Sequence, residues 1–542
     1  MDQLISPYGG NLVNLIDPTK TEALKQEAFS LPSIDLDWRQ QCELEMLMTG
    51  AYSPLTGFMT RAQCAQVETD QKLDDGTFWP LPISLAFQRH ATEKMKPGDR
   101  VALRDGEGYM LAILTIADAW EDAGVWHVGG KVEGVALPPH PDFASLRATP
   151  VELRALFARR GWRRVVAWQA RQPMHRAQFE FCLKSAISQE ANLLLHPKAG
   201  GDITDAPGYF GLVRSFIAIR NRFPAATTQL SLLPAPPREA NPRSLLLRAI
   251  VARNFGCALL IAGGQHLSGG KCRRGEDLDE AHADNQAVKQ AEIIGVKLIA
   301  YPRMVYVEDR AEYLPEAEAP PGSRLLTLSG EEFQRRLQSG LKIPDWYSFP
   351  EVLTELKRQN PPRERRGFTV FFTGLSGAGK STLARMLAAR LMETGGRMVT
   401  LLDGDIVRRN LSSELGFSKA HRDINVRRIG FVASEITKNC GIAICAPIAP
   451  YKQTRRDVRA MIEAVGGFIE VHVATPIETC EARDRKGLYA KARAGLIPEF
   501  TGVSDPYEVP ENAELAIDTT CLGIEEAVQQ VLLKLEHEGY LR

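Results

Sequence analysis

The chain has 542 residues, and its 44% hydrophobic and 24% charged residues are typical of a globular protein of about three or four domains. Its 66 basic and 66 acidic side chains leave no net charge, so we do not expect a general binder of nucleic acid or of membrane surfaces. Nine cysteines without a CxxC pair argue against a disulfide scaffold, and no signal-peptide or membrane-spanning pattern is evident, so we expect a cytoplasmic protein.

Residues 1–137 alternate short apolar segments with turn residues. Two apolar runs on either side of residues 105–108 predict a β-hairpin. We expect a β-rich, barrel-like module that ends near the proline-rich segment at residues 138–142.

Residues 150–310 alternate helical and strand patterns. We expect helices at residues 151–162, 175–188 and 245–255, and strands at residues 164–170 and 258–264. Strands that alternate with helices predict a parallel α/β sheet. A Pro/Gly-rich segment at residues 316–323 and a charged, proline-containing linker at residues 358–367 are candidate domain boundaries.

A phosphate-binding loop follows the apolar strand pattern at residues 368–372. Residues 374–381 read GLSGAGKS, which fits GxxxxGK[ST], and continue into an amphipathic helix. Glycines let backbone N–H groups fold around phosphate oxygens, and the helix N-terminus adds partial positive charge. Lys380 can reach the β- and γ-phosphates, and Ser381 can ligate Mg²⁺. The predicted ATP-binding residues are Gly374, Leu375, Ser376, Gly377, Ala378, Gly379, Lys380, Ser381 and Thr382.

Two carboxylates end the next strand pattern, VTLLDGD. Asp403 and Asp405 stand where they can orient an acceptor hydroxyl and help to hold Mg²⁺. The third strand pattern, which begins at residue 441, ends without an aspartate, and this favours a small-molecule kinase over a motor or switch GTPase. We therefore expect Lys380, Asp403 and Asp405 to be catalytic, with Mg²⁺ and ATP as the cofactor pair.

The C-terminal segment from residue 366 resembles the adenylyl-sulfate (APS) kinase family through the motifs LDGDIVR, LGFS, HRDINVRRIG, RDRKGLYAKARAG and EFTGVSDPYEVPEN. The resemblance implies transfer of the γ-phosphoryl group of ATP to the 3′-hydroxyl of APS, which gives PAPS. It implies APS binding by Arg408, Phe417, Arg422, Asn425 and Phe500. It also implies a lid over the phosphates that carries Arg483, Lys486 and Lys491. Arginines suit the sulfate–phosphate anhydride, and aromatic rings suit adenine.

One position departs from that family. The family commonly has a serine in the segment SFISPY, where it can be phosphorylated. Here the segment reads APIAPY, with Ala449 at that position, so a phosphoserine intermediate is impossible. Direct in-line transfer needs no such serine, and kinase activity is still expected.

The first 350 residues contain the motifs SPLTGFM, WPLPISL, QARQPMHRAQ, IAGGQH and IPDWYSFPEV. Through these motifs they resemble the ATP sulfurylase family, which makes APS and pyrophosphate from ATP and sulfate. An α/β multidomain chain is implied. Its expected parts are a PUA-like β-rich domain at residues 1–138, a Rossmann-like nucleotidyltransferase α/β domain at 139–322, a small helical connector at 323–360, and the P-loop NTPase kinase domain with a parallel sheet at 366–542.

The sulfurylase pattern QxRNPxHxxH is only partly present. Gln169, Arg171 and His175 are retained, while Gln172 replaces the asparagine and Gln178 replaces the second histidine. In the family the two histidines hold ATP phosphates. A neutral amide can donate a hydrogen bond but cannot supply the field of a cation.

A second sulfurylase motif has also lost residues that are charged in the family. Where the family reads GRDHAG, Gly264 and Gln265 replace the arginine and the aspartate, and only His266 remains; Arg248 stands where a helix histidine is usual. Each lost cationic donor typically costs a factor of about 10²–10³ in rate. We therefore expect a vestigial sulfurylase site, formed by Gln169, Arg171, His175 and His266, with little or no turnover.

Several hypotheses remain open. We favour an APS kinase fused to an impaired or inactive sulfurylase-like domain. The alternatives are a fully bifunctional enzyme that makes PAPS from sulfate and ATP, a kinase whose N-terminal module is purely structural and sets the oligomer, and, more distantly, a P-loop kinase for another small alcohol. We expect ATP and APS as small-molecule partners, no nucleic acid, no membrane, and a homo-oligomer.

Overall fold

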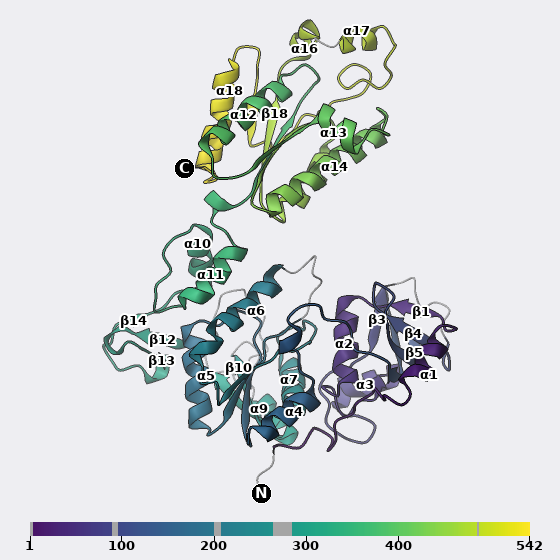
Figure 1. The fold of residues 1–542 in the computed structure, drawn as a ribbon, viewed down its shortest axis with the longest axis vertical. Coiled ribbons are helices and arrows are strands. Elements are labelled where there is room, and N and C mark those ends of the chain that lie inside the picture. Colours follow the sequence, from purple (N-terminus) through teal and green to yellow (C-terminus); the bar gives the residue numbers. More distant parts are fainter. Residues whose placement is uncertain (1–3, 89–95, 200–206, 264–284, 485–486, 542) are drawn as a thin grey trace. The chain divides into compact units, whose positions relative to one another are not determined.

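The computed structural model describes residues 4–88, 96–199, 207–263, 285–484 and 487–541 (Figure 1). The chain forms two compact units, one built from Met1–Arg336 with Lys342–Gln359 and the other from Leu337–Leu341 with Asn360–Arg542. Within the described ranges no helix is long and apolar enough to cross a membrane. The division of the first unit at residues 138 and 322 stays a prediction.

A six-stranded sheet occupies the N-terminal part of the first unit. Its strands are β1 (Ser33–Asp35), β2 (Gly57–Phe58), β3 (Leu85–Gln88), β4 (Arg100–Arg104), β5 (Met110–Asp122) and β6 (Val125–Gly134), and its helices are α1 (Thr21–Ala28), α2 (Trp38–Met48) and α3 (Arg61–Asp70). Strands β4 and β5 pair antiparallel across residues 105–108, which confirms the predicted hairpin.

The α/β part of the first unit is a five-stranded parallel sheet in the order β11-β10-β7-β8-β9. The strands are β7 (Val165–Trp168), β8 (Asn192–Leu195), β9 (Thr228–Leu230), β10 (Leu259–Gly263) and β11 (Lys297–Tyr301). The helices are α4 (Pro150–Arg159), α5 (Arg176–Ser188), α6 (Pro207–Ile219), α7 (Pro242–Asn254) and α9 (Asn285–Ile294). The predicted helices and strands of this region are therefore confirmed. Because the strand order reverses between β7 and β10, the carboxyl ends of these two strands are where a doubly wound sheet binds ligands.

A small sheet and two helices follow in the first unit, except that the last two residues of α10 are counted with the second unit. They are β12 (Met304–Val307), β13 (Glu312–Pro315), β14 (Leu325–Leu326), α10 (Gly330–Gln338) and α11 (Pro350–Gln359). β12 lies between the other two strands and pairs antiparallel with both. Lys184 on α5 lies against this small sheet, because its ammonium donates to the carbonyl of Tyr313 at 2.9 Å.

The second unit is a five-stranded parallel sheet in the order β16-β17-β15-β18-β19. The strands are β15 (Phe368–Thr373), β16 (Val399–Asp403), β17 (Ile442–Ala446), β18 (Gly467–Val473) and β19 (Leu515–Ile517). The helices are α12 (Lys380–Thr394), α13 (Gly404–Leu411), α14 (Lys419–Lys438), α15 (Lys452–Glu463), α16 (Ile477–Arg483), α17 (Leu488–Arg493) and α18 (Ile524–His537).

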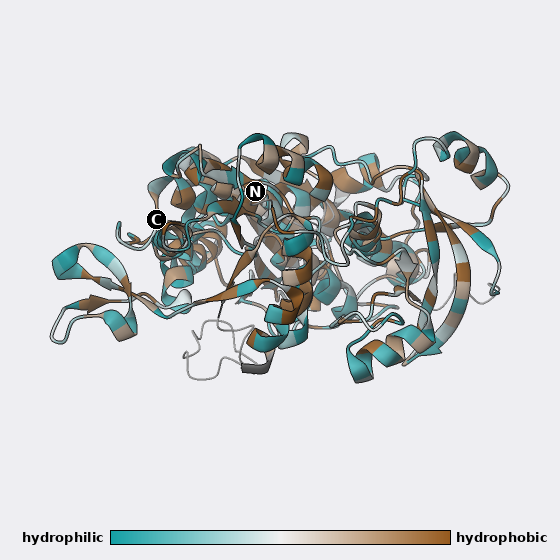
Figure 2. Ribbon diagram, turned by 90° about the horizontal axis from the view of Figure 1, so that it is seen from below, coloured by the Kyte–Doolittle hydropathy of each residue, from teal (hydrophilic) through white to brown (hydrophobic). Residues whose placement is uncertain are grey.

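Strand β15 lies at the centre of this sheet and is buried on both faces. Phe368, Val370 and Phe372 pack with residues of α12 and α18 on one face, while Phe371 packs with α14 and α15 on the other. This alternation follows from the two-residue period of a strand. The helices carry hydrophobic and hydrophilic residues together, as Figure 2 shows, so one side of each helix can cover the sheet while the other meets water.

Candidate active site

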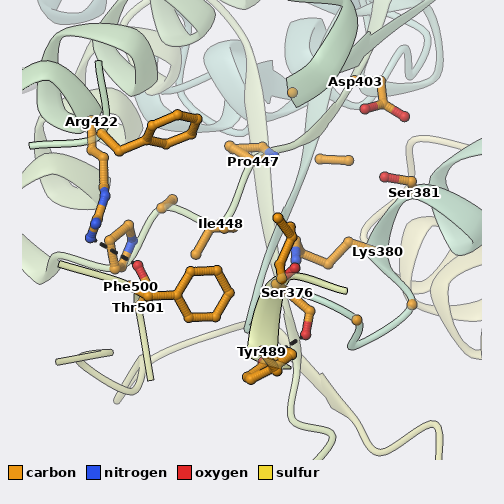
Figure 3. A pocket seen from close by; sticks show the side chains of 18 of the residues that line it. Ser376, Lys380, Ser381, Asp403, Arg422, Pro447, Ile448, Tyr489, Phe500 and Thr501 are labelled. Atoms are coloured by element: carbon orange, nitrogen blue, oxygen red, sulfur yellow. Dashed lines mark hydrogen bonds between the residues drawn. The ribbon is translucent and has the colours of Figure 1, made fainter. Parts of the chain in front are cut away.

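A large cavity of about 1040 Å³ opens at the carboxyl edge of the sheet in the second unit. Its walls come from the glycine loop after β15, the ends of β16 and β17, helix α14, and the segment 496–501 (Figure 3). Ligand pockets in proteins commonly measure roughly 300–1,000 Å³. The cavity therefore has room for more than one small substrate.

The glycine loop forms the floor of a phosphate site. Gly374, Gly377 and Gly379 have positive φ angles of 149°, 78° and 105°. A side chain at Gly374 would meet the carbonyl oxygen of Val473 at 2.5 Å, so only glycine fits there. Helix α12 begins at Lys380, directly after the loop. The N–H groups at a helix N-terminus and the helix dipole favour an anion at this position.

Three predicted groups of the donor site meet here. The ammonium of Lys380 donates to the carbonyl of Leu375 at 2.7 Å, and Ser381 and Asp403 line the same cavity (Figure 3). Asp403 is the buried last residue of β16, and Arg385 Nη2 lies 3.5 Å from its Oδ2. Asp405 is the second residue of α13, but its side chain lies outside the described part of the structure.

Two oxygen-bearing side chains, Ser381 and Asp403, fit a Mg²⁺ ion that is bound together with a nucleotide. Ser381 and Asp403 offer a hydroxyl and a carboxylate, which are the hard oxygen ligands that Mg²⁺ prefers. Among the described residues no group of three or more His, Cys, Asp or Glu side chains could hold a metal by itself. Mg²⁺ usually binds through one or two protein oxygens and the phosphates of its nucleotide, and these two side chains match that pattern.

Arg422 is fixed on the acceptor side of the cavity by three neighbours. Its Nη1 donates to Asp505 Oδ2 at 2.5 Å, to Thr501 Oγ1 at 2.9 Å and to the Tyr451 hydroxyl at 3.3 Å. Tyr451 in turn donates to Asp505 Oδ2 at 2.7 Å, and burial raises the pKa of its phenol to about 12. The guanidinium is thus held along one edge and lines the cavity.

Arg408, Phe417 and Asn425 line the same part of the cavity. Arg408 donates to the carbonyls of Leu415 and Gly416 at 3.0 Å each, and its guanidinium lies 4.3 Å from the Phe417 ring centroid. Phe417 is 63% exposed, so part of its ring remains accessible to a ligand beside Arg408. Asn425 is buried, and its Oδ1 has no hydrogen-bond partner in the described part of the chain, so it offers an acceptor to a ligand.

The predicted lid residues differ in their positions. Arg483, at the end of α16, lines the cavity and donates to Oγ1 and to the carbonyl of Thr519 at 2.8 Å each. Lys491 is exposed on α17 and is not among the lining residues. Lys486 lies outside the described residues. Phe500 lines the cavity, and its ring meets Tyr489 of α17 edge-on, with centroids 5.1 Å apart.

Ala449 lines the cavity at the turn after β17, in a left-handed conformation with φ of 44°. Its carbonyl accepts a hydrogen bond from Arg455 Nη1 at 2.8 Å. The position that carries a serine in the related family is therefore a buried methyl group here.

Sequence reasoning missed several residues of this site, namely Tyr451, Tyr489, Thr501, Asp505 and Thr519. Four of them stand inside quoted segments, Tyr451 in APIAPY, Tyr489 in RDRKGLYAKARAG, and Thr501 and Asp505 in EFTGVSDPYEVPEN. The motifs were the available signal. The pairing of Asp505 with Arg422, 83 residues apart, depends on the tertiary fold.

A second, much smaller cavity of about 20 Å³ lies at the switch point of the sheet in the first unit. Gln169 and Arg171, which follow β7, line it together with Lys198, Arg238 and Arg248. Among the described residues, a space of this size holds about one water molecule; residues 264–284, which follow β10, lie outside the described part of the chain.

The three arginines of this small cavity bind protein groups. Arg248 is buried and donates from Nε to Gln169 Oε1 and from Nη2 to the Gln169 carbonyl, both at 3.0 Å. Arg171 donates to the carbonyl of Arg238 at 2.6 Å, and Arg238 pairs with Glu43 at 2.5 Å. Burial, followed by the charges of Arg248, Arg171 and Arg238, lowers the pKa of Lys198 to about 6.

His175 does not join the small cavity. It is the N-cap of α5, its Nδ1 lies 2.8 Å from Ser348 Oγ, and its ring packs against Phe333 and Tyr347 at centroid distances of 4.9 and 4.8 Å. Burial lowers its pKa to about 4, so the imidazole is neutral at physiological pH. Gln178 accepts a hydrogen bond from the backbone N–H of His175 at 3.0 Å and thus caps its own helix.

Of the remaining positions in the sulfurylase motifs, three lie outside the described residues and one is described. Gly264, Gln265 and His266 lie in the undescribed segment after β10. Gln172 lies in the turn before α5 and is exposed.

Three family models match successive parts of the chain. They describe a PUA-like domain at residues 5–148, ATP-sulfurylase at residues 144–359 and adenylylsulphate kinase at residues 366–518. Together they cover the β-rich sheet, the switch-point sheet and the sheet with the large cavity.

Curated relatives and a solved structure match over the whole length. The chain is 41% identical to a sulfate adenylyltransferase from Emericella nidulans and 42% identical to one from Aspergillus terreus, with 99% of both chains covered in each case. A structure titled hexameric APS kinase from Thiobacillus denitrificans is 74% identical, covers 100% of both chains and superposes with a TM-score of 0.89.

Proposed function

The chain belongs to the sulfate adenylyltransferase family in its fused form, with PUA-like, ATP-sulfurylase and APS kinase domains, and on that premise we propose that it phosphorylates the 3′-hydroxyl of APS with ATP to give PAPS. The observation that carries this proposal is the large cavity. It joins a phosphate loop with Lys380, a buried carboxylate at Asp403, and the acceptor-side residues Arg422 and Asn425 in one space.

The proposed chemistry is direct in-line transfer. The 3′-oxygen of APS attacks the γ-phosphorus, a new P–O bond forms, and the bond to the bridging oxygen breaks to release ADP. Lys380 and the N-terminus of α12 stabilise the charge that develops on the phosphoryl oxygens. Asp405 accepts the proton of the 3′-hydroxyl. The methyl group of Ala449 excludes a phosphoserine route at that position.

Mg²⁺ enters the proposal with ATP. Ser381 and Asp403 would hold it at the phosphate loop, where it would neutralise phosphate charge. On the acceptor side, Phe417 and Phe500 are the rings available to adenine, while Arg408 and Arg422 supply positive charge beside the anhydride.

We further propose that the sulfurylase domain has little or no turnover. Among the described residues, the small cavity at its switch point has room for about one water molecule, and Arg248 donates two hydrogen bonds to Gln169. His175 is neutral and turned toward Ser348. On this proposal, the three arginines that line the cavity bind protein groups through the hydrogen bonds of Arg248, Arg171 and Arg238 and are not arranged to hold the phosphates during adenylyl transfer. The alternative, an enzyme with both activities, is favoured by the name of the curated relatives.

The test of the kinase proposal is formation of PAPS. Incubation of the full chain with APS, ATP and Mg²⁺ should give one ADP and one PAPS per turnover, identified by mass. ATP consumption that does not depend on APS, or phosphorylation of another alcohol in preference to APS, would contradict the proposal.

We also propose a homo-oligomer, because the 74% identical structure is titled hexameric. Light scattering of the purified chain should give a multiple of 60.0 kDa. A mass of one chain at micromolar concentration would contradict it.

A further inference from the structure

The outward-facing carbonyls of the phosphate loop are held by side chains from other elements. A loop that turns its backbone N–H groups toward a phosphate turns carbonyls away from it, and buried carbonyls need donors. Tyr489 donates to the Ser376 carbonyl at 2.9 Å. Thr475 and Thr519 donate to the Ala378 carbonyl at 3.1 and 3.0 Å. These contacts fix the loop from behind.

Tyr489 differs from the two threonines because it also reaches the acceptor side. Its side chain is 2% exposed, and its ring meets Phe500 edge-on at 5.1 Å and an interplanar angle of 76°. Figure 3 shows Tyr489 beneath Ser376 and beside Phe500. Burial raises the pKa of its phenol well above the usual range, so the hydroxyl stays a donor. One side chain thus contacts both halves of the site.

The contacts continue from Phe500 to the acceptor arginine. The Phe500 carbonyl accepts a hydrogen bond from the Asp505 N–H at 3.1 Å. Thr501, next to Phe500, accepts from Arg422 Nη1, which also pairs with Asp505. The phosphate loop, α17, the Phe500 turn and α14 are therefore linked through one chain of contacts.

We propose that Tyr489 is a positioning residue that holds the phosphate loop and the Phe500 ring in the relative position needed for phosphoryl transfer. The inference rests on the proposed kinase function. Tyr489 acts through the Ser376 carbonyl and the Phe500 ring, and two variants remove first one contact and then both. Tyr489→Phe deletes the hydrogen bond and keeps the ring, whereas Tyr489→Leu deletes both.

The test compares these variants in ligand binding and turnover. Loss of a single hydrogen bond weakens binding by about fivefold. Tyr489→Phe should therefore weaken the binding of MgADP, titrated alone, by about that factor. Its affinity for APS should stay within about twofold of wild type, because the ring contact remains. Tyr489→Leu should weaken MgADP equally, weaken APS by about fivefold, and lower kcat further.

Tyr540→Phe is the matched control, because Tyr540 is a buried tyrosine of the same unit that packs on Phe368. It should bind both ligands like wild type. Wild-type MgADP binding by Tyr489→Phe would overturn the inference. So would equal losses for both ligands in both variants together with a fall in Tm, which is what a merely structural role predicts. If wild type forms no PAPS, the kinase proposal fails, while the MgADP titration still decides the role of Tyr489.

Discussion

Arg248 donates two hydrogen bonds to Gln169, from Nε to the side-chain oxygen and from Nη2 to the backbone carbonyl, each at 3.0 Å. The pair lies at the carboxyl end of β7, where the strand order of the sulfurylase sheet reverses. Arg248 therefore holds Gln169 near the place at which this type of sheet binds its ligand. The large cavity of the kinase unit, in contrast, is lined by its predicted ligand-binding side chains.

Loss of Lys380 should remove most of the kinase activity. Lys380→Ala deletes a positive charge from the phosphoryl transition state, so kcat/KM for PAPS formation should fall by at least about 10²-fold. Lys438→Ala, at the exposed end of α14, is the matched control and should behave like wild type. Near-normal turnover by Lys380→Ala would show that the loop is not the donor site.

Substitutions of Asp405 and Arg422 should affect different steps, the first the phosphoryl transfer and the second the binding of APS. Asp405→Asn removes the proposed proton acceptor and should lower kcat by about 10²-fold or more while APS affinity is kept. Arg422→Ala removes a charge that Asp505, Thr501 and Tyr451 hold beside the cavity, and should mainly raise the KM for APS. Steady-state kinetics with varied APS distinguishes the two. A raised KM in Asp405→Asn together with a lowered kcat in Arg422→Ala would mean that the two roles are assigned the wrong way round.

Acidification should unfold the first unit through two buried histidines. Burial lowers the pKa of His175 to about 4 and that of His196 to about 3, from an ordinary value of 6.5. The unfolded chain binds both protons as the pH falls below 6.5 and the folded chain does not. Stability is therefore complete above pH 6.5 and is lost toward pH 4, at up to about 2.7 kcal/mol per pH unit.

Tryptophan fluorescence in urea measures this change, because all seven tryptophans lie between residues 38 and 346, in the first unit. His175→Gln should roughly halve the pH dependence between pH 6 and 4.5, since one of the two protons is removed. An unchanged slope in this variant would mean that His175 is not buried in its neutral form.

Restoring the sulfurylase site should require Arg248 to be removed. The substitutions Gln172→Asn, Gln178→His, Gly264→Arg and Gln265→Asp restore the family motifs, but Arg248 would still hold Gln169. We expect detectable ATP formation from APS and pyrophosphate only when Arg248→His is added. Equal rates with and without that fifth substitution would show that Arg248 does not block the site.

Local patterns predicted the parts of the fold that depend on neighbouring residues. The alternation of strands and helices around β7 and α5, the glycine loop before Lys380 and the position of Asp403 at the end of β16 all follow from periodicity and turn chemistry. The identity of both domains followed from motifs of the same local kind.

Contacts between distant residues could not be predicted in this way. His175 meets Ser348 across 173 positions, and Tyr489 meets the Ser376 carbonyl across 113. Arg248, which stands where a helix histidine is usual in the family, donates to Gln169 across 79 positions. A sequence pattern specifies which face of an element is buried, while the partner on that face depends on how the elements pack.

The central claim, a working kinase fused to a silent sulfurylase domain, is tested most directly by running the sulfurylase reaction backward. The Lys380→Ala variant, which cannot consume APS through the kinase, is incubated with APS, pyrophosphate and Mg²⁺, and ATP is measured by luminescence. We predict no ATP above the level obtained without protein. A kcat in the ordinary enzyme range of about 1–10³ s⁻¹ would contradict the account and show a fully bifunctional enzyme.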